Sequence, residues 1–132
     1  MNRVTARTHA MQLIYEWEMG GEGGEETRLN LLGAKPGEEE YAYMERMFKG
    51  VVENVEELDR RIEENARGWT LERLSRVDLA ILRLAAYEMS LGQISDSIIV
   101  TEAVEMARLF SGDKSPQFIH GVLGGVSRSM AQ

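Results

Sequence analysis

Residues 75–92, SRVDLAILRLAAYEMSLG, are apolar on nearly every side of the helix that their spacing predicts. A helix at the surface of a globular protein keeps a polar face, whereas this segment keeps only scattered charges. We therefore expect it to be a central helix, buried by other helices that pack around it.

The segments on both sides of this helix also repeat apolar residues at helical spacing, but on one face only. Longer helices are expected at residues 5–19, 38–54, 55–67, 98–110 and from 115 to the C-terminus. Short helical turns are expected through RLNLLG (28–33) and TLERL (70–74). The sequence thus predicts an all-α domain of about seven helices, some of them short.

Residue types give further detail on the last two helices. The expected buried face of the first of them consists of Val100, Ala103, Val104, Ala107 and Phe110. The last helix is expected to begin with Ser115 as N-cap and Pro116 as its first helical residue.

Composition limits the class of protein. The chain has 132 residues, is 43% hydrophobic and has no cysteine, so it can form one domain with a core but no disulfide or cysteine-bound metal site. No apolar run approaches the ~20 residues that span a bilayer, and the N-terminus is too polar and too periodic for a signal peptide. We expect a single cytoplasmic domain over residues 1–132.

Charge is distributed unevenly along the chain. The formal net charge is −7, which argues against broad, sequence-blind binding of nucleic acid. Residues 1–15 contribute +2, residues 16–72 contribute −9 and residues 73–132 contribute 0. The two ends could therefore still approach a phosphate backbone together.

Neither histidine is in a pattern typical of catalysis or metal binding. His9 and His120 lack the Glu-x-x-His spacing of di-metal bundles, and no His-Glu-x-x-His occurs. A Ser-His-Asp site is not excluded by the sequence, but no strand-turn-helix elbow is expected to hold its nucleophile. The glycines of GGEGGEE (20–26) are followed by no lysine and are flanked by glutamates, which repel phosphate. We expect no catalysis, cofactor or metal.

Two helix edges carry residues that suit a binding surface. On the last helix, Phe118 lies beside the apolar stripe, one turn after Lys114 and near a helix start that favours anions. Phe118 can be a rim residue of the core or an aromatic that stacks on a base. Arg7, Met11 and Tyr15 line one edge of the first helix. Arg7 can be a solvated residue and Tyr15 a boundary residue with its hydroxyl in water, or both can contact a ligand, and the sequence favours neither interpretation.

Four stretches together resemble the NusB family of bacterial transcription antitermination factors. They are ARTHAMQLIYEW (6–17), GVVENVEELDRRI (50–62), LERLSRVDLAILRLAAYEM (71–89) and TEAVEMARLFSGDKSPQFIHGVL (101–123). The resemblance implies an all-helical fold of two packed subdomains. It also implies an adaptor that binds RNA and protein without catalysis.

The resemblance further implies specific partners. Family members bind the single-stranded boxA element of ribosomal RNA leader transcripts together with the ribosomal protein NusE. They do so within a complex on RNA polymerase that suppresses termination. Because NusE is basic, an acidic surface suits it.

Positions that match the family's motifs imply the site residues. The implied RNA contacts are Arg3 and Arg7 for phosphates, and Lys114, Gln117 and Phe118 for bases and backbone. The implied contacts to the NusE-like partner are Tyr15, Glu72, Arg76 and Asp78. Only two arginines stand in the N-terminal arm, so we expect weak RNA binding by the protein alone, restored when the partner adds cations. His120 is interpreted as a polar residue at a helix edge.

Two other functions remain open on the sequence. The chain could be an accessory module in ribosomal RNA processing, since the N-terminal domain of a ribosomal RNA methyltransferase shares this fold. In that case we expect no methyl transfer by the chain itself, because its 132 residues contain no Rossmann-type segment. It could also be a homodimeric interaction protein that hides its RNA face.

Overall fold

The computed structural model describes residues 2–20 and 38–131. Its elements, in chain order, are α1 (Arg3–Glu18), α3 (Glu39–Glu53), α4 (Val55–Asn65), the 3₁₀ turn η1 (Leu71–Arg73), α5 (Arg76–Leu91), α6 (Asp96–Phe110) and α7 (Ser115–Met130). The described residues contain no strand, so the all-α prediction is confirmed. The helical turn expected at 28–33 lies outside the described residues.

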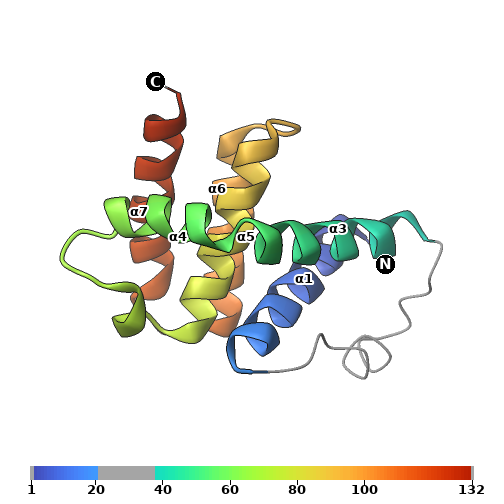
Figure 1. The fold of residues 1–132 in the computed structure, drawn as a ribbon, viewed down its shortest axis with the longest axis horizontal. Helices are drawn as coiled ribbons and strands as arrows, with labels where there is room; N and C mark the ends of the chain where they lie inside the picture. Colours follow the sequence, from blue (N-terminus) through green and yellow to red (C-terminus); the bar gives the residue numbers. More distant parts are fainter. Residues whose placement is uncertain (1, 21–37, 132) are drawn as a thin grey trace.

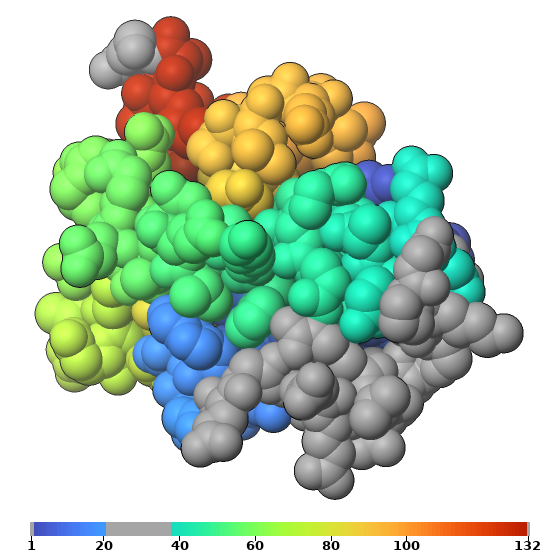
Figure 2. Space-filling model, turned by 45° about the vertical axis from the view of Figure 1, so that its right-hand side comes forward, coloured from blue at the N-terminus to red at the C-terminus, as the bar shows by residue number. Residues whose placement is uncertain are grey.

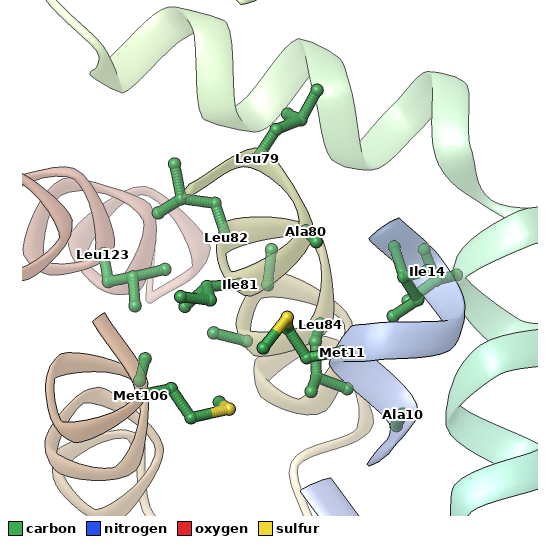
Figure 3. Close-up of a cluster of buried hydrophobic side chains, with 14 of the residues drawn as sticks. Ala10, Met11, Ile14, Leu79, Ala80, Ile81, Leu82, Leu84, Met106 and Leu123 are labelled. Atoms are coloured by element: carbon green, nitrogen blue, oxygen red, sulfur yellow. The ribbon is translucent and has the colours of Figure 1, made fainter. Parts of the chain in front are cut away.

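Helix α5 is the centre of the molecule. It starts at Ser75, whose hydroxyl accepts a hydrogen bond from the Asp78 N–H at 3.0 Å, and it ends at Gly92 in the left-handed conformation (φ +66°). Every other α-helix of the described residues packs against it. Figure 3 shows Leu123 and Met106 of α7 and α6 on one side of α5, and residues of α1 on the other. The expectation of a buried central helix is confirmed.

The remaining helices form two groups around α5. Helix α1 packs with α3, and α6 packs with α7 (Figure 1). Helices α3 and α4 follow one another with only Asn54 between them, and they cross one face of the molecule with α6 and α7 above and the end of α1 below (Figure 2). We call α3 and α4 together the belt. Within the belt, α3 covers α1 and α4 covers α7. The two subdomains that the resemblance implied are therefore present, joined by α5 and by the belt.

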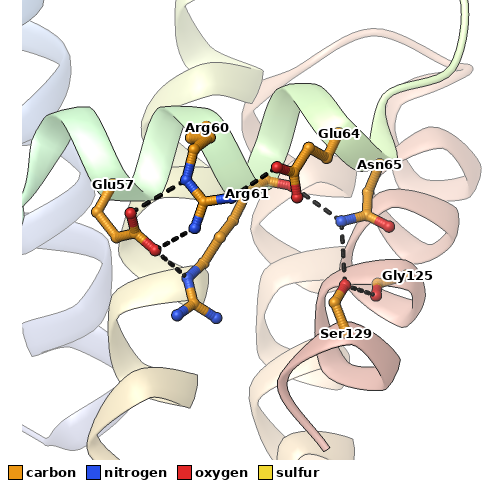
Figure 4. Close-up of polar contacts among 7 residues, drawn as sticks. All are labelled: Glu57, Arg60, Arg61, Glu64, Asn65, Gly125 and Ser129. Atoms are coloured by element: carbon orange, nitrogen blue, oxygen red, sulfur yellow. Dashed lines mark hydrogen bonds and ion pairs between the residues drawn. The ribbon is translucent and has the colours of Figure 1, made fainter. Parts of the chain in front are cut away.

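Small residues allow two close helix crossings within this arrangement. A Cβ at Gly50 of α3 would overlap the ring of Tyr87 on α5. A Cβ at Gly125 of α7 would overlap the side-chain amide of Asn65 at the end of α4. The Asn65 amide donates to the Ser129 hydroxyl at 3.4 Å, which links α4 to α7 (Figure 4).

Arg83, on α5, joins the two groups electrostatically. Its guanidinium donates to both carboxylate oxygens of Asp59 on α4, at 2.8 and 2.9 Å, and lies 3.3 Å from a carboxylate oxygen of Glu18 on α1. The Arg83 side chain is only 6% exposed. By contrast, Arg60 forms its ion pairs with Glu57 and Glu64 on the solvent-facing side of α4 (Figure 4).

Two details of the last helices differ from expectation. Phe110 is 42% exposed, because the buried side of α6 runs through Ile99, Ala103, Met106 and Ala107 and is rotated from the predicted face. Ser115 is the first helical residue rather than the N-cap, which is Lys114. The Ser115 hydroxyl bonds to Asp78 of α5 at 3.0 Å instead of capping its own helix.

A helix that crosses a bilayer must be both long and apolar. Among the described residues, none of the helices combines these two properties.

Candidate functional site

The start of α7 meets the turn that follows α4, and the two place a pair of aromatic rings side by side. Gly68, with φ +80°, lets the chain reverse after α4, and the Trp69 N–H closes the turn on the Ala66 carbonyl at 2.9 Å. The ring centroids of Trp69 and Phe118 are 6.1 Å apart and the planes are inclined by 65°. Trp69 is 47% exposed, and Phe118 packs partly against the core.

Two hollows adjoin this pair of rings. The first has a volume of about 370 Å³, and its wall consists of Trp69, Arg73, Leu74, Ser75, Asp78, Lys114, Ser115 and Phe118. The second has a volume of about 420 Å³, and its wall includes Arg67, Trp69, Gln117, Phe118, Gly121 and Arg128. Both rings border both hollows, so the surface offers aromatic and polar groups on either side of the pair.

Four cations border the two hollows. Arg67, Arg73, Lys114 and Arg128 are exposed, and none of them forms an ion pair with another described residue. The Arg73 guanidinium lies 5.9 Å from the centre of a Trp69 ring. The first turn of α7 contains no acid, and its free N–H groups favour an anion. On a chain of net charge −7, this region combines cations with aromatic faces, the two features that bind single-stranded nucleic acid.

The N-terminal arginines lie elsewhere and differ from one another. The Arg3 guanidinium donates to Glu40 at 2.6 Å, lies 4.0 Å above the Tyr43 ring and has a side chain 38% exposed. Its hydrogen bond lowers the pKa of Glu40. In Figure 1 the start of α1 and the start of α7 are at opposite ends of the molecule, so one compact site does not contain both.

Arg7 is a correction to the sequence analysis, which expected it at the surface as a phosphate contact or a solvated residue. It is 7% exposed, and its Nε donates to both oxygens of Glu88 on α5, at 3.0 and 3.2 Å. Burial opposes its charge, but the hydrogen bonds and charge of Glu88 more than offset this and keep the pKa of Arg7 above its ordinary value. Arg7 thus fastens α1 to α5. Met11, on the same edge, is also buried.

The four implied contacts for a protein partner also differ in their exposure to solvent. Tyr15 is 36% exposed and Glu72 is exposed, so both can be reached. Arg76 donates to Glu18 at 2.9 Å and to the Leu74 carbonyl at 2.7 Å, which leaves it partly buried.

Asp78 is the second correction, because a docking residue must be accessible and Asp78 is 7% exposed. Its carboxylate accepts hydrogen bonds from the hydroxyls of Ser111 at 2.7 Å and Ser115 at 3.0 Å. Asp78 therefore holds the turn between α6 and α7 against α5.

The two histidines differ in their surroundings. His120 is exposed on α7, and His9 is buried, which lowers its pKa. Within residues 2–20 and 38–131, no group of three or more His, Cys, Asp or Glu residues is placed to hold a metal.

Sequence reasoning missed the side chains that complete the aromatic region. The residue patterns singled out none of Arg67, Trp69, Arg73 and Arg128. The available signal is RGWTLER (67–73), in which a tryptophan stands in a turn between two arginines. A tryptophan outside the helical apolar pattern indicates a side chain that the core does not need.

The sequence of this chain is similar to those of known NusB proteins. The model of the NusB family matches residues 4–128. The transcription antitermination protein NusB of Clostridium botulinum (strain Hall) is 40% identical over 140 residues, which cover 94% of this chain and 98% of that protein. The protein of the same name from Thermoanaerobacter sp. (strain X514) is 37% identical over 128 residues, covering 97% of this chain and 91% of that one.

Solved structures agree on the fold. NusB of T. maritima, at 24% identity, superposes with a TM-score of 0.86 and covers 97% of this chain and 92% of its own. A crystal structure of the antitermination factors NusB and NusE in complex with dsRNA, also at 24% identity, gives a TM-score of 0.86 and covers 96% of both chains. The family model and the relatives at 40% and 37% identity show that the chain belongs to the NusB family.

Proposed function

We propose that this protein is a transcription antitermination adaptor of the bacterial cytoplasm. In this proposal it binds boxA-type single-stranded RNA of ribosomal RNA leader transcripts together with the ribosomal protein NusE, within the antitermination complex on RNA polymerase, and catalyses no reaction. Its relatives are named as antitermination proteins, and a protein of the same fold has been crystallised with NusE and RNA.

The observation that carries the RNA-binding part is the pair of aromatic rings, Trp69 and Phe118, next to four cations that form no ion pair with another described residue. Base stacking on aromatic rings and phosphate attraction by lysine and arginine are the two main sources of affinity for single strands. Lys114, Gln117 and Phe118 are the proposed contacts there, and Arg3 is the proposed contact at the far end of the molecule. Arg7 is assigned a structural role instead.

The partner-binding part is supported by charge and exposure. Tyr15 and Glu72 are accessible, and residues 16–72 hold most of the chain's negative charge. A basic ribosomal protein is attracted to such a surface, and its own cations would strengthen RNA binding by the complex. Arg76 and Asp78 are proposed to shape this region from within.

The test is binding of a boxA-like RNA 12-mer and a scrambled 12-mer, at two salt concentrations, with and without the NusE-type protein from the same cell. We expect weak binding by the protein alone and clearly tighter, sequence-dependent binding with the partner. Equal binding of both RNAs would favour a processing module without boxA specificity. If neither RNA binds and light scattering shows a dimer, the protein is a homodimeric interaction protein instead.

A further inference from the structure

We propose that Trp69 supplies a second base-stacking position, so that the bound RNA strand continues from Phe118 across α7 into the hollow lined by Arg67 and Arg128. This inference rests on the proposed function, because it concerns the same RNA. It adds three residues that the family motifs in the sequence do not assign, and it defines the path and the conformation of the strand.

The exposure of Trp69 is the first step of the argument. Tryptophan buries the largest apolar surface of any residue when it serves the core, yet this one is 47% exposed and lies outside the buried core. Its ring touches Phe118 only in an edge-to-face arrangement. An aromatic face is therefore left for a ligand.

The second hollow has a shape and a charge that suit a nucleotide. Its volume of about 420 Å³ lies within the ~300–1,000 Å³ range of small-ligand sites. No carboxylate is among its lining residues, although the chain has 22 acids, and two arginines border it. Gly121 lies on its α7 side, and a Cβ there would meet no atom within 4 Å, so the helix surface is open to a base.

The angle between the rings restricts the RNA conformation. A base stacked on Phe118 and a base stacked on Trp69 would be inclined to one another by about the 65° that separates the ring planes. Neighbouring bases in a duplex are nearly parallel, so a duplex cannot place bases on both rings. The site thus selects a single strand that turns between two unstacked bases.

Two neighbouring cations suit each base position. Arg73 and Lys114 border the first hollow, together with the Asp78 carboxylate, which accepts hydrogen bonds from Ser111 and Ser115. Arg67 and Arg128 border the second hollow, which has no carboxylate. None of these four is neutralised by a described acidic side chain. Arg73 lies close to a Trp69 ring from the side of the first hollow, which leaves the part of the indole that borders the second hollow for a base.

Fluorescence tests the inference directly, because the chain has two tryptophans. In a Trp17→Phe background, Trp69 is the sole indole, and we expect the boxA-like 12-mer, added to the complex with the NusE-type protein, to quench it in a saturable way. A tryptophan-free Trp17→Phe/Trp69→Phe variant gives the signal of the partner. RNA affinity is measured in parallel by anisotropy of labelled RNA. If the partner alone changes Trp69 fluorescence and RNA adds nothing, Trp69 belongs to the protein interface and the inference is wrong.

A double-mutant cycle separates base stacking from mere support of Phe118. We expect Trp69→Leu to weaken RNA binding by roughly tenfold and Trp69→Phe to weaken it less. Because the two rings are in contact, we expect the Trp69→Leu/Phe118→Leu double variant to bind more weakly than either single variant, without full additivity. If the double variant binds no worse than Phe118→Leu alone, Trp69 only positions Phe118. Unchanged melting temperatures show that the variants are folded.

The outcomes distinguish this inference from the proposed function. Tight boxA binding with neither quenching nor a loss in Trp69→Leu overturns the Trp69 site and leaves the adaptor function intact. Absence of RNA binding by the unmodified complex overturns both. Arg67→Gln should lower affinity and the salt dependence together, whereas the matched control Arg46→Gln, an exposed arginine of α3, should change neither.

Discussion

Lys114 is the residue on which the electrostatic part of RNA binding depends most directly. It is exposed, has no acidic partner among the described residues, and is the N-cap of α7, where unbonded N–H groups add a partial positive charge. Side chain and helix start therefore attract the same phosphate.

We predict that Lys114→Glu weakens RNA binding, because it reverses a charge at the contact. Salt screens this charge, so the loss should be largest at low salt and shrink as ionic strength rises. Lys49→Glu is the matched control, since Lys49 is an exposed lysine on α3. Binding titrations at several salt concentrations decide the matter, and equal losses in both variants would remove Lys114 from the site.

The burial and role of a single residue are hard to predict from sequence. The position of Phe118 at the edge of the buried stripe followed from helical spacing. The burial of Arg7 did not, because its partner Glu88 is 81 residues away in sequence. Asp78 is buried for a similar reason, since its partners Ser111 and Ser115 lie more than 30 residues further along the chain, beyond α6. Whether a polar residue at a helix edge is buried or exposed can be decided only when its packing partner is known.

At the scale of the elements, the spacing between helices depends on residues that have no side chain. Gly50 allows α3 to lie against Tyr87 of α5. Gly121 of α7, by contrast, faces open space. Substitution by alanine should therefore have opposite effects on stability at the two glycines.

We predict that Gly50→Ala destabilises the protein by roughly 1–3 kcal/mol, because the added methyl group forces the Tyr87 ring out of its packed position. Gly121→Ala should stabilise it by about 0.5–1 kcal/mol, since alanine favours a helix and nothing obstructs its Cβ. Urea unfolding of both variants provides the free energies. Equal effects in the two variants would show that the α3–α5 crossing relaxes without cost.

Helix positions were largely predictable, since periodicity, Ser75 and Pro116 mark the beginnings of α5 and α7 within a residue. The buried face of α6 was predicted less well. Ile99 and Met106 fit the core as well as Phe110 does by hydropathy, and only the contact of α6 with both α5 and α7 decides between them. The short helical turn expected at 70–74 is present as η1, but the role of the neighbouring Trp69 depends on α7, which is remote in sequence.

For the whole molecule, Arg83 is the side chain that connects the two groups of helices. It contacts Glu18 of α1 and Asp59 of α4 from its place on α5. Removing it would leave two carboxylates, 25% and 21% exposed, without this partner.

We predict that Arg83→Met destabilises the protein by roughly 2–4 kcal/mol, somewhat less than for a fully buried ion pair because both acids keep partial contact with water. Arg60→Met is the control, since it removes ion pairs on the solvent side of α4 and should change stability little. Thermal unfolding of both variants tests this. A melting temperature for Arg83→Met that matches the unmodified protein would show that the ion pairs of Arg83 do not stabilise the contact between the two groups.

The all-α architecture could be predicted because every long segment has helical periodicity and residues 75–92 are apolar all round. The pairing of α1 with α3, and of α6 with α7, could not be predicted from the residues alone. Several helices have similar apolar stripes, and only shape complementarity at crossings such as Gly50 and Gly125 selects the neighbours.

The central place of α5 has a consequence for how the protein comes apart. Since one helix fills the interior of both groups, neither group retains a complete core once the other has separated from α5. Unfolding is then a single cooperative event, without a stable half-folded species. The backbone amides of α5 would exchange with solvent deuterium only through that event, more slowly than those of any helix at the periphery.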